Sequence, residues 1–187
     1  MGKVRVEIYD SSKPDSSLTE LLISAHLSEL NYLTITPDGK FLATASSKGT
    51  LIRVFDTSTG EKLREFRRGT DQADINSIAF SPDMKYVCCS SSSGRGTVHI
   101  FSWEEPGAGY SFMSYVPYVN AWRSSTQFGI IPGVKSICTF LPGDQNAVVV
   151  ICSNGYYYKY TFEPSFANPP AQAEFSKFLT DAHVNPN

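Results

Sequence analysis

A short turn signature that recurs along the chain limits what this sequence can fold into. The pattern Thr/Ser-Pro-Asp stands at Thr36–Asp38 and again at Ser81–Asp83, with the two prolines 45 positions apart. Proline presets the backbone angle of a turn, and the aspartate side chain bonds its own backbone two residues further on. Short runs of apolar and β-branched residues flank each signature. The pattern therefore predicts pairs of strands joined by a tight turn, repeated along the chain.

The signature belongs to a longer unit of three strands, in which a glycine-containing turn precedes the third strand. The three copies of this unit are Leu30–Asp56, Ile75–Ser102 and Val134–Tyr160. Small residues such as Ser90–Ser92 follow the second strand, where they allow neighbouring sheets to approach closely. A period of about 40–45 residues with roughly four short strands is typical of β-propeller blades. The sequence therefore predicts an all-β fold built from such blades.

The chain has 187 residues, which is enough for one sizeable core but not for a closed ring. We expect an open partial propeller with about three and a half blades of an expected seven. The expected segments are a partial blade at 4–26, blades at 27–70, 71–133 and 134–165, and a C-terminal tail at 166–187. Within this tail, Phe175–Leu179 has a weak helical periodicity. Such a chain is either part of a longer protein or closes by pairing with another chain, because the faces where further blades pack are otherwise exposed.

Composition narrows the classes of function. The net charge of −2 argues against bulk nucleic-acid binding, so any anion site must be local. The four cysteines have no Cys-x-x-Cys spacing and are predicted to be buried free thiols in a reducing compartment: Cys88, Cys89, Cys138 and Cys152. There is no nucleophile elbow, P-loop or metal-ligand spacing, so we expect neither an enzyme nor a bound cofactor. No apolar run approaches about 18 residues, and the N-terminus does not resemble a signal peptide.

The insertion at 103–121, within the second complete blade, is unusually rich in apolar side chains for a loop. Five aromatic or sulfur-bearing residues fall within nine positions: Tyr110, Phe112, Met113, Tyr115 and Tyr118. Tyrosine and phenylalanine suit a membrane interface, where an apolar ring body meets a wet edge. Alternatively, the loop folds back and buries these rings. The composition of the loop leaves both interpretations open.

Two adjacent arginines in the segment Phe66–Gly69 are the most distinctive candidate site residues. They follow one predicted strand and precede another. Because side chains alternate along extended backbone, Arg67 and Arg68 point to opposite sides. The pair is either a solvated basic turn or reaches into two neighbouring grooves that hold anions.

Four motifs together resemble the PROPPIN family, whose members are WD-repeat-like seven-bladed propellers and include the WIPI proteins. The motifs are Lys48–Asp56, Phe66–Thr70 with its Phe-Arg-Arg-Gly, Gly96–Phe101 and Ile151–Lys159. The resemblance extends from about Val4 to Phe162. It implies two phosphoinositide head-group pockets on neighbouring blades, with phosphatidylinositol 3-phosphate and phosphatidylinositol 3,5-bisphosphate as the favoured lipids.

Carried over position by position, the resemblance assigns Arg67 to the first pocket and Arg68 to the second. The matching candidates are His26, Ser46, Thr50 and Arg53 for the first, and Ser91, Thr97, His99 and Ser124 for the second. The insertion corresponds to the family's membrane-inserting loop, which favours the membrane interpretation of its five apolar residues.

The resemblance also implies a cellular role without chemistry of its own. The chain would be a cytoplasmic effector in autophagy, peripheral on pre-autophagosomal, endosomal or vacuolar/lysosomal membranes. Its protein partners would be autophagy lipid-transfer or conjugation machinery. The alternative is a WD-repeat scaffold that binds proteins only, with Arg67 and Arg68 holding an acidic peptide.

Overall fold

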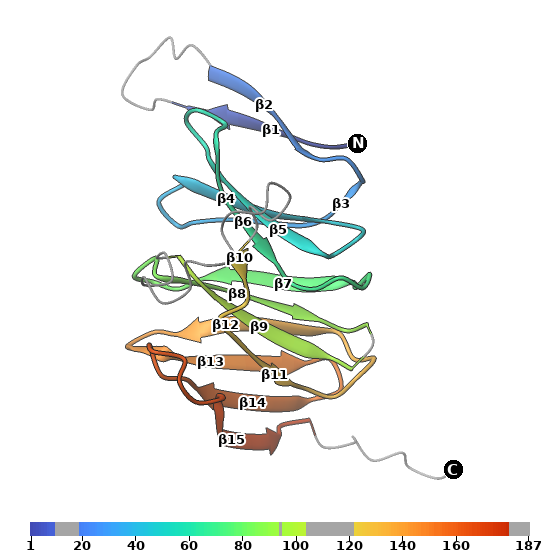
Figure 1. Cartoon of the computed structure of the whole chain (residues 1–187), viewed down its shortest axis with the longest axis vertical. Coiled ribbons are helices and arrows are strands. Elements are labelled where there is room, and N and C mark those ends of the chain that lie inside the picture. The colour runs from blue at the N-terminus through green and yellow to red at the C-terminus, as the bar shows by residue number, and fades with distance from the viewer. Residues whose placement is uncertain (10–18, 94, 104–121, 180–187) are drawn as a thin grey trace, which may run out of the picture. The chain divides into compact units, whose positions relative to one another are not determined.

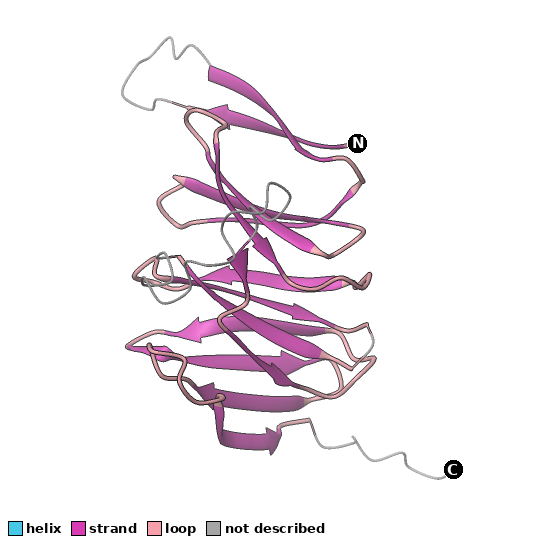
Figure 2. Cartoon of the chain, viewed as in Figure 1, coloured by secondary structure: helices cyan, strands magenta, loops and turns pink. Residues whose placement is uncertain are grey.

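The computed structural model describes residues 1–9, 19–93, 95–103 and 122–179, and these residues form fifteen β-strands joined by turns and loops (Figures 1 and 2). The described ranges contain no helix, and hence no helix long and apolar enough to cross a membrane. The chain divides into two compact units. Unit 1 holds the described residues of Met1–Gln72 and Phe112–Arg123, and unit 2 those of Ala73–Ser111 and Ser124–Asn187.

Unit 1 contains a two-stranded and a five-stranded sheet. Strands β1 (Gly2–Ile8) and β2 (Thr19–His26) form an antiparallel pair. The larger sheet is a meander with the strand order β10-β6-β5-β4-β3. Its strands are β3 (Leu30–Ile35), β4 (Phe41–Ser46), β5 (Leu51–Asp56), β6 (Lys62–Arg67) and β10 (Trp122–Arg123). β10 pairs parallel to β6, whereas the other neighbours are antiparallel. The three strands predicted in Leu30–Asp56 are thus confirmed.

Unit 2 contains two four-stranded sheets, with the orders β11-β9-β8-β7 and β12-β13-β14-β15. The first comprises β7 (Ile75–Phe80), β8 (Tyr86–Ser91), β9 (Thr97–Ser102) and β11 (Thr126–Gly129). The second comprises β12 (Ser136–Leu141), β13 (Asp144–Cys152), β14 (Tyr156–Thr161) and β15 (Ala171–Lys177). The second and third copies of the repeat therefore also form the predicted strands.

Strand β15 lies in the segment that sequence analysis assigns to the C-terminal tail. The weak helical prediction is wrong for Phe175–Lys177, which pair with the edge of β14. Phe175 stacks on Tyr156 with ring centroids 5.4 Å apart and packs beside Tyr158. Backbone pairing and ring contacts with β14 outweigh the weak local preference for helix.

The two Thr/Ser-Pro-Asp turns share one hydrogen-bond pattern. In the first, the Thr36 hydroxyl donates to the Asp38 carboxylate (2.6 Å) and accepts from the Phe41 backbone N–H (3.0 Å). In the second, Ser81 makes the equivalent bonds to Asp83 and from Tyr86. The next residue in each turn has a left-handed backbone, with φ of 74° at Gly39 and 61° at Met84. The signature thus specifies the turn through side-chain bonds to the backbone, as predicted.

Small and sulfur-containing residues bring the two sheets of unit 2 close together. The Ser90 hydroxyl donates to the Ser136 carbonyl (2.9 Å), and the Ser77 hydroxyl bonds the backbone of Cys138 (3.2 Å). The thiols of Cys88 and Cys138 lie 3.6 Å apart. All four cysteines are free and buried, which confirms that they are buried free thiols. Close approach through small side chains is what the sequence predicted for the segment after the second strand.

Each unit also has a sheet face that carries exposed apolar side chains. In unit 1, Leu33 and Ile35 on β3 are 51% and 53% exposed, although they share their face with buried Leu42. In unit 2, Ile137 and Ile151 form a cross-strand pair and are 59% and 41% exposed. A blade normally covers such a face with its neighbour, so these are surfaces on which further propeller structure can pack.

Candidate functional site

The two adjacent arginines differ in how far the protein itself engages them. Arg67 is the last residue of β6 and pairs with Leu51. Within the described residues its half-buried side chain makes no hydrogen bond or ion pair, so the guanidinium has donors available. Arg68 donates through Nε to the Gly49 carbonyl (2.8 Å) and through an Nη to the Asp71 carbonyl. Arg68 thus braces a turn of unit 1, whereas Arg67 is available to a ligand.

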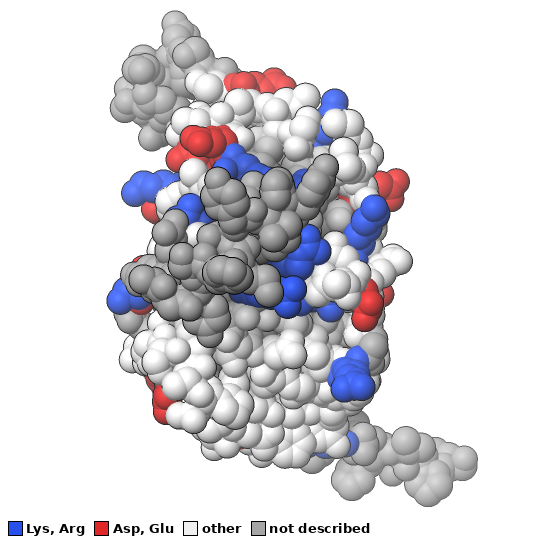
Figure 3. Space-filling model, viewed as in Figure 1, with Lys and Arg blue, Asp and Glu red and all other residues white. Residues whose placement is uncertain are grey.

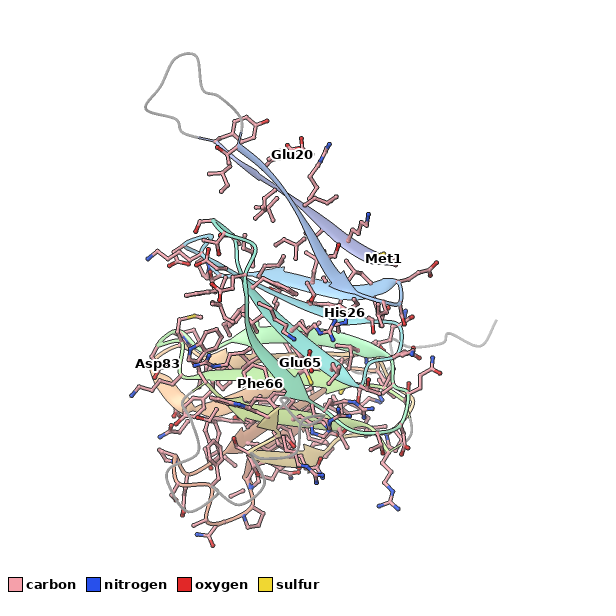
Figure 4. All side chains as sticks on the ribbon, turned by 45° about the horizontal axis from the view of Figure 1, so that its top comes forward. Met1, Glu20, His26, Glu65, Phe66 and Asp83 are labelled. Atoms are coloured by element: carbon pink, nitrogen blue, oxygen red, sulfur yellow. The ribbon has the colours of Figure 1, made fainter. Side chains whose placement is uncertain are left out.

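Strand register places Arg67 on the face of the sheet that looks towards β2. Arg53 pairs with Thr44 on one side and with Glu65 on the other, so these three side chains share a face. Arg67 lies two residues after Glu65 and therefore on the same face. Phe66 points to the opposite face and is fully buried. Figure 4 labels Glu65 and Phe66 on β6 and His26 on β2.

His26 closes a polar network beneath this face. Its Nε2 lies 3.0 Å from the Thr44 hydroxyl, and the Arg53 guanidinium donates to the carbonyl of Ala25 (2.7 Å). The pKa of His26 is lowered to about 4, mainly because the ring is buried and secondly because of the nearby positive charge of Arg53. The imidazole is therefore neutral at pH 7 and adds a polar contact rather than a charge.

Glu65 provides the negative charge that holds the cations of this network. It accepts from Arg53 Nε at 2.7 Å and from Lys62 Nζ at 3.0 Å. Burial raises the pKa of Glu65, but the hydrogen bonds from Lys62 and Arg53 outweigh that effect, so on balance it is lowered. Arg53, predicted as a head-group ligand, thus has two of its donors occupied by Glu65 and Ala25.

The residues predicted for the first pocket gather at one rim of unit 1. His26 ends β2, Ser46 ends β4, Arg67 ends β6, and Thr50 directly precedes β5. Antiparallel strands alternate in direction, so Ser46, Thr50 and Arg67 lie at one end of the five-stranded sheet. His26 belongs to the two-stranded sheet and joins them through its contact with Thr44 on β4. The Arg68 backbone N–H donates to the Thr50 carbonyl (3.0 Å), which fixes this corner. Arg53 lies further from this end of the sheet, because it pairs with Thr44 and Glu65, which precede Ser46 and Arg67 by two residues.

The residues predicted for the second pocket form one hydrogen-bonded chain within unit 2. The Ser91 hydroxyl contacts the Thr97 hydroxyl, which contacts His99 Nε2, and His99 Nδ1 contacts the Ser124 hydroxyl, each at 3.2 Å. His99 is buried. The structure thus brings these four predicted residues together in unit 2, whereas the fifth, Arg68, lies in unit 1. Strand pairing of β8 with β9 places Ser91 opposite Thr97.

Arg123 is a basic residue beside Arg67 that sequence reasoning missed. β10 runs parallel to β6 and pairs Trp122 with Phe66 and Arg123 with Arg67, so both arginines lie on the same face. Arg64 lies over the Trp122 ring at 4.9 Å, and Phe66 meets that ring edge-on at 6.3 Å. Arg123 is exposed. Figure 3 shows Lys and Arg side chains gathered over the region of β6.

No signal in the sequence pointed to Arg123, because it follows the long insertion and belongs to a strand of two residues. Thr44 and Glu65 were also missed. Their positions follow from the two-residue period once the register of β4, β5 and β6 is known. The predicted membrane-inserting residues Tyr110, Phe112, Met113, Tyr115 and Tyr118 lie outside the described residues. Among the residues that are described, no three His, Cys, Asp or Glu side chains gather as metal ligands would.

Comparison with known proteins gives consistent matches. A family model described as PROPPIN matches residues 3–111. Autophagy-related protein 18e of Arabidopsis thaliana is 34% identical over 168 residues, which covers 84% of this chain and 44% of that protein. Autophagy-related protein 18 of Dictyostelium discoideum is 35% identical over 175 residues, covering 77% of this chain and 46% of that protein. The chain thus spans less than half the length of these curated relatives.

Solved structures share the fold. Hsv2 of Kluyveromyces lactis matches with a TM-score of 0.76 and 21% identity, covering 95% of this chain and 56% of that chain. A complex of KlAtg21 with the coiled-coil of AgAtg16 matches with a TM-score of 0.66 and 23% identity, covering 94% of this chain and 54% of that chain. The predicted all-β fold of propeller blades, forming an open partial propeller, is confirmed.

Proposed function

Because this chain belongs to the PROPPIN family, we propose that it binds phosphoinositide head groups at membranes and acts there as an effector in autophagy. The observation that carries the proposal is the rim of unit 1, where the Arg67 guanidinium, which no described residue engages, lies with His26, Ser46 and Thr50. A guanidinium matches phosphate oxygens in a two-pronged geometry, and hydroxyl groups bond the inositol ring. The named relatives are autophagy-related proteins, which supports the cellular part of the proposal.

The ligands proposed for this rim are phosphatidylinositol 3-phosphate and phosphatidylinositol 3,5-bisphosphate. Arg67 binds a phosphate, and Arg123 adds positive charge on the same face. Arg53 has Glu65 and Ala25 as partners, so it positions this wall of the site and offers its remaining donors. Within unit 2, the set Ser91, Thr97, His99 and Ser124 is proposed as a second head-group site on the two-pocket pattern of the family. Its chain of hydroxyl and imidazole groups supports that part.

Membrane attachment then comes from several weak contacts on one protein. Each basic residue near an anionic membrane contributes only about 1 kcal/mol, so head-group sites and the apolar insertion at 103–121 have to act together. We propose that Tyr110, Phe112, Met113, Tyr115 and Tyr118 enter the membrane interface. The proposed location is peripheral, on pre-autophagosomal, endosomal or vacuolar/lysosomal membranes, with autophagy lipid-transfer or conjugation machinery as partners.

Vesicle flotation tests the proposal. Wild type is compared with Arg67→Ala and with Arg67→Ala/Arg68→Ala on vesicles with and without phosphatidylinositol 3-phosphate. Removing a charge-assisted pair of hydrogen bonds costs about 1.5–3 kcal/mol, so we expect Arg67→Ala to weaken binding about tenfold to a hundredfold. The matched control is Arg5→Ala, which removes an exposed arginine that is paired with Glu7 on β1. Equal flotation of wild type and the double variant would refute the lipid-binding function.

The second candidate is a protein-binding scaffold. The solved complex of a related chain with a coiled-coil favours this alternative. In that case Arg67 and Arg68 hold an acidic peptide, and flotation does not depend on the 3-phosphate lipid. An acidic peptide that binds wild type but not the double variant, together with lipid-independent flotation, would select the scaffold.

A further inference from the structure

The turn between β2 and β3 presents a leucine to solvent beside the first candidate site. Leu27 is 87% exposed, although the residue before it, His26, is buried. Single exposed apolar residues are common on protein surfaces and need no explanation by themselves. Leu27, however, lies on the same rim as the first candidate head-group site.

Hydrogen bonds join this turn to the other turns of the same rim. The Ser47 backbone N–H donates to the Glu29 carbonyl at 2.8 Å, which ties the β2–β3 turn to the β4–β5 turn. The β4–β5 turn is in turn bound by Arg68, through the Gly49 carbonyl, and by Gln72, through the Ser47 carbonyl (3.2 Å). Leu27 therefore lies on one continuous, hydrogen-bonded rim with the segment that contains both arginines.

We propose that Leu27 inserts into the interface of the bilayer whose phosphoinositide occupies the Arg67 site. This inference rests on the proposed function, because the occupant of the rim is the lipid surface that carries the head group. A head group bound at Arg67 brings its own bilayer to the rim, so an exposed leucine next to His26 meets lipid rather than water. The exposed Lys48 on the adjoining turn adds a charge that favours an anionic surface.

The charges on the turn indicate that Leu27 contributes to membrane binding through its apolar side chain. Glu29 is exposed on the same turn and is repelled by anionic lipid, which offsets Lys48. Attraction at this turn must therefore come from burying the leucine side chain. Two variants separate these effects: Leu27→Ser removes the apolar contact, and Glu29→Gln removes the repulsion.

The test measures vesicle binding and soluble head-group binding side by side. On vesicles containing phosphatidylinositol 3-phosphate, we expect Leu27→Ser to weaken binding about threefold to tenfold, because partial burial of a leucine is lost. Glu29→Gln is expected to strengthen binding by a smaller factor. Affinity for soluble inositol 1,3-bisphosphate should be unchanged in both variants. The matched control is Leu33→Ser, which removes an exposed leucine on the β3 sheet face, away from the turn.

The outcomes distinguish this inference from the proposed function. If Arg67→Ala abolishes vesicle binding and Leu27→Ser binds like wild type, the head-group site stands and the Leu27 contact is refuted. An equal loss in Leu33→Ser also refutes it, because the effect would then belong to apolar surface in general. If wild type ignores the 3-phosphate lipid, both proposals fall. An environment-sensitive dye on Leu27→Cys, but not on Leu33→Cys, should shift to shorter emission wavelength on vesicles, since the four native thiols are buried.

Discussion

The two candidate sites use different chemistry to hold their polar groups in place. In unit 1, the charged groups of Arg53, Lys62 and Glu65 brace one another beneath the rim. In unit 2, Ser91, Thr97, His99 and Ser124 are connected through hydroxyl and imidazole contacts of 3.2 Å. A network with its own carboxylate can hold cations in place before an anionic ligand binds. Hydroxyl groups carry no charge, so attraction of an anionic ligand to them needs a cation from another part of the protein. We therefore expect unit 1 to supply most of the charge attraction and unit 2 to supply orientation.

The largest effect on stability is expected at Glu65, the shared acceptor of the unit 1 network. Glu65→Gln keeps the shape of the side chain but leaves Arg53 and Lys62 without a carboxylate. Because Glu65 and Arg53 are largely buried, we expect the free energy of unfolding to fall by about 2 kcal/mol. Urea unfolding followed by circular dichroism measures it.

Glu7→Gln is the matched control for that experiment. Glu7 pairs with Arg5 at 2.9 Å, but on the surface of β1. Exposed ion pairs contribute about 0–1 kcal/mol, so this variant should stay close to wild type. Equal small losses at Glu65 and Glu7 would contradict the idea that unit 1 is braced by internal charge.

The comparison also shows which parts of the site a sequence can predict. The turns were predictable, because Thr36 and Asp38 form their bonds locally. The positions of Ser46, Thr50 and Arg67 at one rim follow from alternating strand directions within the five-stranded sheet. The pairing of Arg53 with Glu65 was not foreseen, because it depends on the register of β5 with β6, including an irregularity at Val54/Phe55.

The missed and mistaken elements share a physical cause, namely pairing between segments that are distant or weakly patterned. Arg123 reaches Arg67 only through the parallel pairing of β10, a two-residue strand. The weak helical pattern at Phe175 is overridden by the edge of β14. Hydrogen bonds to a free strand edge are available to almost any sequence, so the residues themselves carry little signal of the outcome.

An intermediate effect on stability is expected from acid, through His26 of unit 1. The pKa of His26 is about 4 in the folded protein, below its ordinary value of 6.5, because of burial and then the charge of Arg53. The unfolded chain therefore binds the proton more readily. The contribution of neutral His26 to the free energy of unfolding is complete above about pH 6.5 and is lost as the pH falls towards 4. Lys62 opposes and Glu65 favours protonation within the same network.

Urea midpoints at pH 7.5 and pH 5 measure this dependence. Between these values wild type should lose on the order of 1–2 kcal/mol from His26, and His26→Gln should remove most of that loss. If His26→Gln shows the full wild-type dependence, the acid sensitivity does not come from the unit 1 network.

The smallest effect is expected at the end of the unit 2 chain. Ser124→Ala removes one hydroxyl contact with His99 Nδ1 and should cost about 0.5 kcal/mol of stability, because a net hydrogen bond between neutral groups contributes little. If these groups orient a head group, the same variant should lose more free energy of vesicle binding than free energy of unfolding. Thr97→Val, which interrupts the chain between Ser91 and His99, should have a larger effect on both measurements. If Ser124→Ala and Thr97→Val match wild type in both urea midpoint and flotation, the unit 2 chain contributes to neither stability nor binding. The rim of unit 1 would then be the sole head-group site among the described residues.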